Sequence, residues 1–271
     1  MNEKENIPDE PNEPQPHDDE LSAVDKIVGV FIAPASTFKY LAGRPDFWTP
    51  LIVLSLIGIA FAMMVLPKTM PVGQAAAIEK VQEQLDKAPG TSEQDRAKTI
   101  EIVKKTSEIS GYVAAIIGTP IAMGIMWVIM VAVIFFISLM QGLDTDFKRL
   151  LGVVPWASFV SFFSQGLQTW VMMSRDLTSM DQLQNMRYLK PFSLLGLFPE
   201  TVELPKFVEG IFGTIDPFFI WYVILLIIAV QQANKCTRAQ AAVSSLIYTA
   251  LSLAAVGGLT VLGALQQVEV K

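Results

Sequence analysis

Five stretches of this chain are so apolar, and so free of charge, that they predict membrane spans. None of them contains an Asp, Glu, Lys, Arg or His residue. A helix needs about 20 apolar residues to cross a bilayer core of about 30 Å. The whole chain is 17% charged, whereas a soluble domain carries about 25%. We therefore predict an all-α integral membrane protein, a five-helix transmembrane bundle with spans at about residues 50–66, 112–140, 151–173, 217–232 and 241–265.

The N-terminal tail, residues 1–20, has a different composition. It contains eight acidic residues, one lysine and four prolines, and almost no large apolar side chain. Such a segment buries too little apolar surface to offset the entropy of ordering, so we expect it to be disordered. It lacks the basic and apolar regions of a cleavable secretory signal. Two interpretations stay open: a solvated leader, or a segment that binds a basic partner.

Residues 21–48 predict an amphipathic segment at the membrane surface. Its first part should form a helix that ends before Pro34, because apolar residues recur there at helical spacing: Leu21, Val24, Ile27, Val28 and Phe31. Aromatic residues mixed with Lys39 and Arg44 then precede the first span. This mixture is typical of the membrane–water interface. We expect an N-terminal interfacial helix that lies along the bilayer.

Two long loops separate the spans, at residues 67–111 and 174–216. Pro67 should end the first span. The first loop predicts an extramembrane helical hairpin between spans 1 and 2, because Ile78, Val81 and Leu85 share one helix face and Ser92–Asp95 forms a capping box for a second helix. That second helix, with Ile100 and Val103 as its apolar residues, can run directly into the second span. The second loop mixes prolines with large apolar residues, so it should either dip into the interface or cover the end of the bundle.

The short loops predict the orientation. Loop 141–150 contains Lys148 and Arg149, and loop 234–240 contains Lys235 and Arg238. Basic residues in short loops mark the cytoplasmic side, whereas long loops count less. We expect a cytoplasmic N-terminus, with both long loops and the C-terminus outside.

The third span carries a polar stripe. Its members recur at helical offsets of 0, 3, 7 and 10: Ser158, Ser161, Gln165 and Gln168. They share one face of a regular helix. The stripe predicts either a pathway for a solute or water, or hydrogen bonds between helices that are worth about 0.6–1.7 kcal/mol each.

Two further positions stand out in the spans. Pro120 should kink the second span, with neighbouring groups satisfying the carbonyl that it leaves free. Asp216 and Pro217 begin the fourth span, where the Asp side chain should accept hydrogen bonds from the first free N–H groups. A buried functional carboxylate is the alternative for Asp216.

Nothing in the sequence predicts a cofactor, a metal centre, nucleic-acid binding or an enzyme. His17 is the only histidine and Cys236 the only cysteine, which excludes the usual zinc, haem and Ser-His-Asp arrangements. Asp144 and Asp146 form a pair that lacks a third ligand in the sequence around it. Phosphate-binding glycine motifs are also missing from the sequence.

Three stretches together resemble a known family. They are Phe31–Phe38 before Phe47–Pro50, then Lys148–Trp156, and finally Ile215–Trp221 followed by Lys235 and Ala241–Ser252. Their order and spacing are similar to bacterial members of the Yip domain family, Ypt/Rab-interacting membrane proteins, over about Val24–Leu265. The resemblance implies a five-span bundle with a cytoplasmic N-terminus, here in the bacterial inner membrane. Eukaryotic relatives bind prenylated Rab GTPases, so the resemblance implies such a partner by analogy.

Two functional hypotheses follow. The first is a non-enzymatic membrane scaffold or adaptor whose partners are the lipid bilayer and other membrane proteins, including a second copy of the chain. The second is a small-solute transporter or channel that uses the polar face of the third span. Solute flux across a liposome membrane would distinguish them.

Overall fold

The computed structural model describes residues 20–87, 92–199 and 201–268. Five helical segments in these ranges are long and apolar enough to cross a membrane, which confirms an all-α bundle of five spans. The segments are α3 (Trp48–Asp86), α4 (Glu93–Val113) continued by η1 (Ala114–Gly118) and α5 (Thr119–Met140), α6 (Phe147–Val153) continued by η2 (Val154–Val160) and α7 (Ser161–Ser174), α11 (Pro217–Asn234), and α12 (Arg238–Val268).

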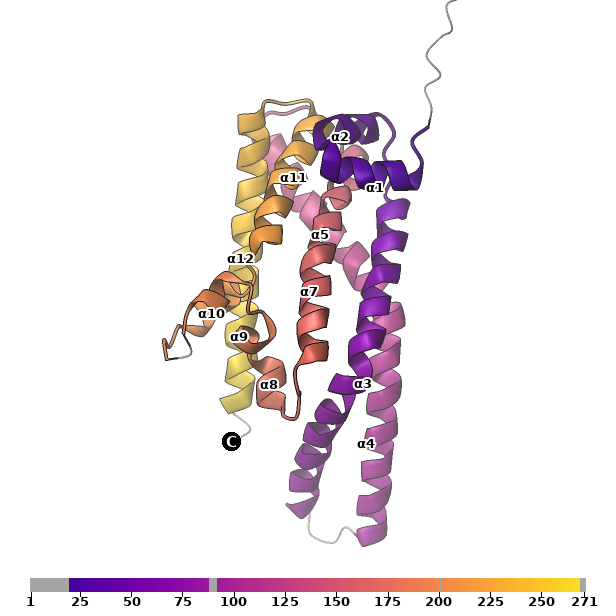
Figure 1. Ribbon diagram of the computed structural model, residues 1–271, viewed down its shortest axis with the longest axis vertical. Coiled ribbons are helices and arrows are strands. Elements are labelled where there is room, and N and C mark those ends of the chain that lie inside the picture. Colours follow the sequence, from indigo (N-terminus) through magenta and orange to yellow (C-terminus); the bar gives the residue numbers. More distant parts are fainter. Residues whose placement is uncertain (1–19, 88–91, 200, 269–271) are drawn as a thin grey trace, which may run out of the picture.

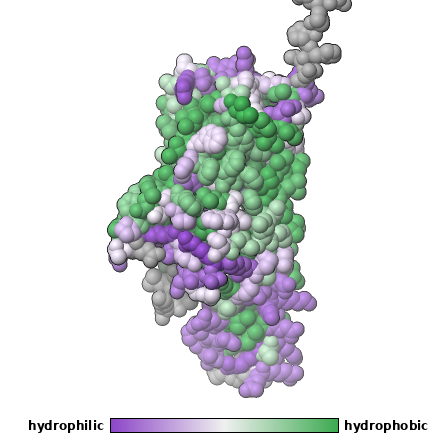
Figure 2. Space-filling model, in the orientation of Figure 1, coloured by the Kyte–Doolittle hydropathy of each residue, from purple (hydrophilic) through white to green (hydrophobic). Residues whose placement is uncertain are grey.

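The spans alternate in direction (Figure 1). One end of the bundle, which we call the α1–α2 end, carries α1 (Ala23–Ile32), α2 (Pro34–Gly43) and the short connections from α5 to α6 and from α11 to α12. The other end carries the last turn of α3, the first turn of α4 and the C-terminal end of α12. The face seen in Figure 2 has an apolar belt that begins next to the α1–α2 end and gives way to hydrophilic side chains toward the other end.

The third span is the centre of the bundle. Half of its most apolar window is buried inside the protein, against 11% for α12 at the periphery. Trp156, Val154 and Leu150 in this span are fully buried, together with Leu225 and Leu226 of α11. These residues belong to one continuous core. The outer helices therefore leave most of their apolar residues facing outward, as expected of helices in lipid.

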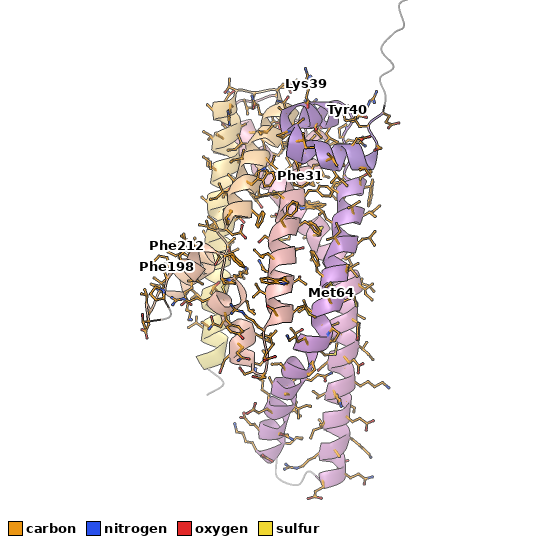
Figure 3. The ribbon with its side chains drawn as sticks, viewed as in Figure 1. Phe31, Lys39, Tyr40, Met64, Phe198 and Phe212 are labelled. Atoms are coloured by element: carbon orange, nitrogen blue, oxygen red, sulfur yellow. The ribbon has the colours of Figure 1, made fainter. Side chains whose placement is uncertain are left out.

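The helices α1 and α2 form a lid across one end of the bundle. Ser22 and Asp25 form a capping box that starts α1, and the helix ends at Ile32, before Pro34 as its sequence predicts. Phe38 and Leu41 of α2 are fully buried, and α2 packs on α6 and α11. Phe31 points from α1 into the bundle, where its ring contacts Phe163 at 5.5 Å between ring centroids (Figure 3). One face of the lid therefore belongs to the protein core.

The other face of α1 remains free for lipid. Val24, Val28 and Ile32 follow one another at four-residue intervals and are all exposed. Sequence alone predicted a segment lying along the bilayer. In the structure, the segment packs on the bundle with one side and presents an apolar edge with the other.

The connection from α2 to α3 is held tightly. Lys26 pairs with Asp46 at 3.1 Å, and the indole Nε1–H of Trp156 donates to the Asp46 carbonyl oxygen at 2.7 Å. Gly152 lies so close that an added Cβ would be 2.3 Å from Cβ of Pro45. Only glycine fits this contact between the lid and the central span.

The α3–α4 hairpin extends far beyond the apolar belt (Figures 1 and 2). The helix α3 does not end at Leu66, as its sequence suggested, but continues through Pro67 and Pro71 to Asp86. Its 39 residues correspond to a length of about 58 Å at about 1.5 Å per residue. Each proline removes one backbone hydrogen bond and bends the helix without terminating it.

Packing of α3 on α4 compensates for the prolines. The predicted apolar residues Ile78, Val81, Leu85, Ile100 and Val103 are all half-buried. Ser92 caps α4 by accepting the backbone N–H of Asp95 at 3.2 Å. Arg96 donates to the Leu85 carbonyl oxygen at 3.0 Å and pairs with Asp86, which fastens the tip of the hairpin.

Pro120 lies just after a π-helical turn. The backbone N–H of Thr119 donates to the carbonyl oxygen of Ala114, five residues earlier. A single wide turn of this kind inserts one residue into an α-helix. The position at which the sequence predicts a kink, Pro120, thus directly follows an irregular turn of the second span.

The segment between α7 and α11 folds into short helices: α8 (Met180–Gln184), α9 (Met186–Leu189), η3 (Leu194–Leu197) and α10 (Lys206–Phe212). The ring of Phe198 stacks on Phe212 at 5.6 Å between centroids (Figure 3). The helix α10 packs closely on α12, because the residues at the contact are glycines without a Cβ. Gly210 of α10 lies against Thr260, and Gly257 of α12 lies against Phe207. This segment therefore covers the side of α12.

Candidate functional site: a polar cluster at the start of α11

A polar cluster lies where α7, the α9–η3 segment and the first turn of α11 meet. Its members are Ser164, Gln168, Lys190 and Asp216, and we call it the Asp216 cluster. They come from three separate parts of the chain. Polar groups gathered between spans are either a structural link or a functional site.

Asp216 uses both oxygens of its carboxylate. Oδ1 accepts the backbone N–H of Phe219 at 2.7 Å and so caps α11. Oδ2 accepts the hydroxyl of Ser164 on α7. Pro217 occupies the first helical position, where its missing N–H costs nothing and its fixed φ favours the helix. One carboxylate thus starts α11 and joins it to the central span.

Lys190 contributes a half-buried cation near this carboxylate. Burial lowers the pKa of Lys190, because the charged ammonium loses its hydration, and the negative charge of Asp216 partly opposes this shift. The loop around Lys190 is fixed to α11 by the hydrogen bond from the Leu194 N–H to the Ile215 carbonyl oxygen at 2.7 Å. The position of Lys190 relative to Asp216 is therefore set by backbone contacts.

The cluster surrounds a small cavity of about 20 Å³, closed on one side by Pro191 and Phe192. A cavity needs about 10–15 Å³ for one water molecule, with two to four polar partners. The carboxylate, the ammonium and the hydroxyl of Ser164 provide such partners. The cavity therefore has the size and the polar lining that a single water molecule needs.

The predicted stripe only partly coincides with this cluster. Gln168 belongs to it, and its amide donates to Ser164 Oγ at 3.5 Å. Ser158 lies in η2, which is a 3₁₀-helix, so the spacing of a regular α-helix does not apply to it. Ser161 is half-buried at the start of α7, and Gln165 is exposed. The structure does not bring these four residues together.

Sequence reasoning missed Ser164 and Lys190. Ser164 precedes Gln168 by four residues, which was the available signal for a shared helix face. Lys190 lies in a long loop, and no periodic pattern places it beside Asp216. A pairing between elements of this kind depends on the tertiary fold.

A second polar group, the Asn234 network, lies buried near the α1–α2 end. The side-chain amide of Asn234 donates to Ser138 Oγ at 3.0 Å and accepts from Thr145 Oγ1 at 2.8 Å. Ser138 and Ser244 are in hydrogen-bond contact at 3.2 Å, and Gln141 donates to Ser244 at 2.7 Å. These bonds join α5, α11 and α12. The sequence patterns did not reveal this network either.

Comparison with known proteins finds one matching family. The model of the Yip1 domain family matches residues 28–259, which include most of the lid, the first four spans, most of the fifth span and both polar groups. No curated protein and no solved structure matches the chain.

Proposed function

The chain belongs to the Yip1 domain family, and from that premise we propose that it is a non-enzymatic membrane scaffold or adaptor that binds other membrane proteins. The orientation proposed with it places the N-terminus and the α1–α2 end in the cytoplasm of a bacterial cell. The hairpin and the C-terminus then lie outside the inner membrane. Short basic loops at the α1–α2 end support this orientation.

One observation carries the proposal: an unpaired apolar stripe on α4. Ile102 and Ile109 are 64% and 54% exposed, although they lie among charged residues before the charge-free stretch begins at Tyr112. They share one face of α4, because residues seven apart lie two turns apart. The seam with α3 uses the other side, through Ile100 and Val103. Charged residues surround the stripe, so we take a protein partner rather than lipid as its occupant.

The family also suggests where a cytoplasmic partner would bind. Eukaryotic relatives bind prenylated GTPases, so GTPases are one class of partner to test. In the proposed orientation such a partner meets the α1–α2 end, whereas the hairpin meets partners outside. The two surfaces can be tested separately.

Crosslinking in the membrane tests the scaffold proposal. A photo-reactive residue at Ile109 of the full chain should give discrete adducts with membrane proteins. The matched control is the same residue at Glu108, which is exposed on another face of α4. Adducts at Ile109 should weaken several-fold when Ile102 is replaced by Glu. Equal adducts at both positions, or adducts with lipid alone, would contradict the proposal.

The Asp216 cluster favours a second candidate, a small-solute transporter or channel. A half-buried Lys and Asp beside a cavity next to the spans resemble the charged groups of solute and proton pathways. The cavity has room for about one water molecule, so solute passage requires α7 and α11 to separate. Proteoliposomes should then show flux that Gln165→Leu plus Gln168→Leu, or Ser164→Ala, reduces. Proteoliposomes without flux, or flux that these changes leave intact, would rule against this function.

A further inference from the structure

A cavity at the α1–α2 end combines basic side chains with the boundary of the apolar belt. It has a volume of about 410 Å³ and lies between the α5–α6 connection and the turn from α11 to α12. Its polar lining includes Asp144, Arg149, Asn234, Lys235, Thr237 and Gln240. Basic pockets between spans near the membrane surface suit the headgroups of anionic lipids.

The two cations of the cavity are available for an anion. Arg149 uses Nη1 to donate to the carbonyl oxygen of Ala233 at 3.1 Å, which fixes the guanidinium at the cavity and leaves other N–H groups free to donate. Lys235 is exposed and forms no ion pair within the described part of the chain. Asp144 is the one acidic side chain in the lining.

The backbone of Lys235 adds a second observation. This residue ends α11 in the left-handed conformation, with φ of 50° and ψ of 37°. Helices usually place glycine at such a position, because a Cβ makes the conformation costly. Among the described residues, Lys235 is the only one other than glycine with positive φ. A lysine that occupies a glycine position directs an ammonium to the cavity at the expense of backbone strain.

The surroundings of the cavity suit acyl chains. Met140 ends α5 directly before the connection that lines the cavity and is 88% exposed. Val243 and Leu246 of α12 are also exposed, one and two turns after Gln240. A phosphate held by Arg149 and Lys235 would therefore have an apolar helix surface next to it. The turn also places the N-terminus of α12 at the cavity, where the helix dipole favours an anion. The backbone N–H groups of Thr237 and Gln240 are already capped there by each other's side chains.

We propose that this cavity binds a phosphate group, and that the phosphate belongs to the headgroup of an anionic phospholipid. Arg149 and Lys235 neutralise the phosphate, and the side-chain NH₂ of Gln240, whose Oε1 accepts from Thr237, supplies a further donor. Asp144 opposes binding and so tunes its strength. This inference does not depend on the scaffold proposal, because it concerns a lipid at the other end of the bundle from the hairpin.

Binding to the purified full chain in detergent tests the site. Phosphatidylglycerol should bind and be retained in native mass spectrometry, whereas phosphatidylcholine should not. Each lost cation should weaken binding about fivefold, the usual effect of one Lys or Arg near an anionic surface. Lys235→Gly is the decisive variant, because it removes the ammonium while relieving the backbone strain. A folding defect therefore does not explain its loss of binding.

Three comparisons complete the experiment. Lys148→Gln removes an exposed cation next to Arg149 that does not line the cavity, and it should leave binding unchanged. Asp144→Asn should tighten binding. Inorganic phosphate added as a competitor separates the two sources of the ligand. If it fails to displace phosphatidylglycerol, the ligand is the lipid. If it displaces phosphatidylglycerol, the site takes a free phosphate anion, and the assignment to a lipid headgroup is overturned. Equal binding of phosphatidylcholine, or binding that Lys235→Gly leaves intact, would overturn the proposal.

Discussion

The hydroxyl of Ser164 donates to the carboxylate of Asp216, fifty-two residues further along the chain. The same carboxylate caps α11 through the N–H of Phe219. The side chain that caps α11 therefore also links α11 to the central span through Ser164. Loss of Asp216 should therefore affect both functions at once.

Asp216→Ala should lower the free energy of unfolding by about 1–3 kcal/mol, because it removes the cap and leaves the Ser164 hydroxyl without its acceptor. Ser164→Ala should have a smaller effect of about 0.6–1.7 kcal/mol. Thermal unfolding in detergent measures both. The double variant should cost less than the sum of the single variants, and strict additivity would contradict the link. Asp181→Ala, on α8, is the control.

Gly152→Ala should destabilise the lid. Its Cβ would lie 2.3 Å from Cβ of Pro45 and 2.8 Å from the backbone N of Asp46, so α2 and α3 must shift. Overpacking of this kind costs about 1–3 kcal/mol. Gly258→Ala is the matched control, because nothing lies within 4 Å of its added Cβ. It should be neutral or stabilising by about 1 kcal/mol through helix propensity. Similar unfolding temperatures for both variants would refute the close contact.

Lys190 should make stability rise with pH in the alkaline range. Burial lowers the pKa of Lys190 below its ordinary value of 10.5, so the unfolded chain binds this proton more tightly than the folded protein. Stability then increases as pH rises from the folded pKa toward the ordinary value. Lys190→Met should be more stable than the parent at neutral pH and should lose this increase. If both proteins show the same pH profile up to pH 10.5, partial burial does not lower the pKa of Lys190.

Cysteine labelling should establish the orientation after Cys236 is replaced by serine. A cysteine at Gln94, exposed near the tip of the hairpin, should react with a membrane-impermeant reagent added outside intact cells. A cysteine at Lys148, exposed at the α1–α2 end, should react only after the membrane is opened. The reverse pattern would invert the proposed topology. Cys236 itself is a poor target, because burial raises the pKa of its thiol.

The elements that sequence predicted well are those with a strong local signal. The five spans follow from apolar composition, and the caps at Ser92 and Asp216 follow from single polar residues before apolar runs. The passage of α3 through Pro67 was missed, because packing on α4 outweighs the local tendency of proline to end a helix. The prediction of a polar stripe assumed a regular α-helix for the whole third span. Ser158 instead lies in a 3₁₀-helix, so it does not share a helix face with Ser161, Gln165 and Gln168 in the expected way. Lys190 and the Asn234 network meet their partners only through tertiary structure, for which no local pattern exists.

The central position of the third span has a consequence for biogenesis. The most apolar window of this span is less apolar than that of the second span, and half of it is covered by protein. A helix of modest hydropathy leaves the translocon for lipid less readily than a strongly apolar one. The third span therefore depends on the preceding and following spans to receive it during synthesis. Variants in η2 should reduce the amount of protein that reaches the membrane before they change the melting temperature of the molecules that do.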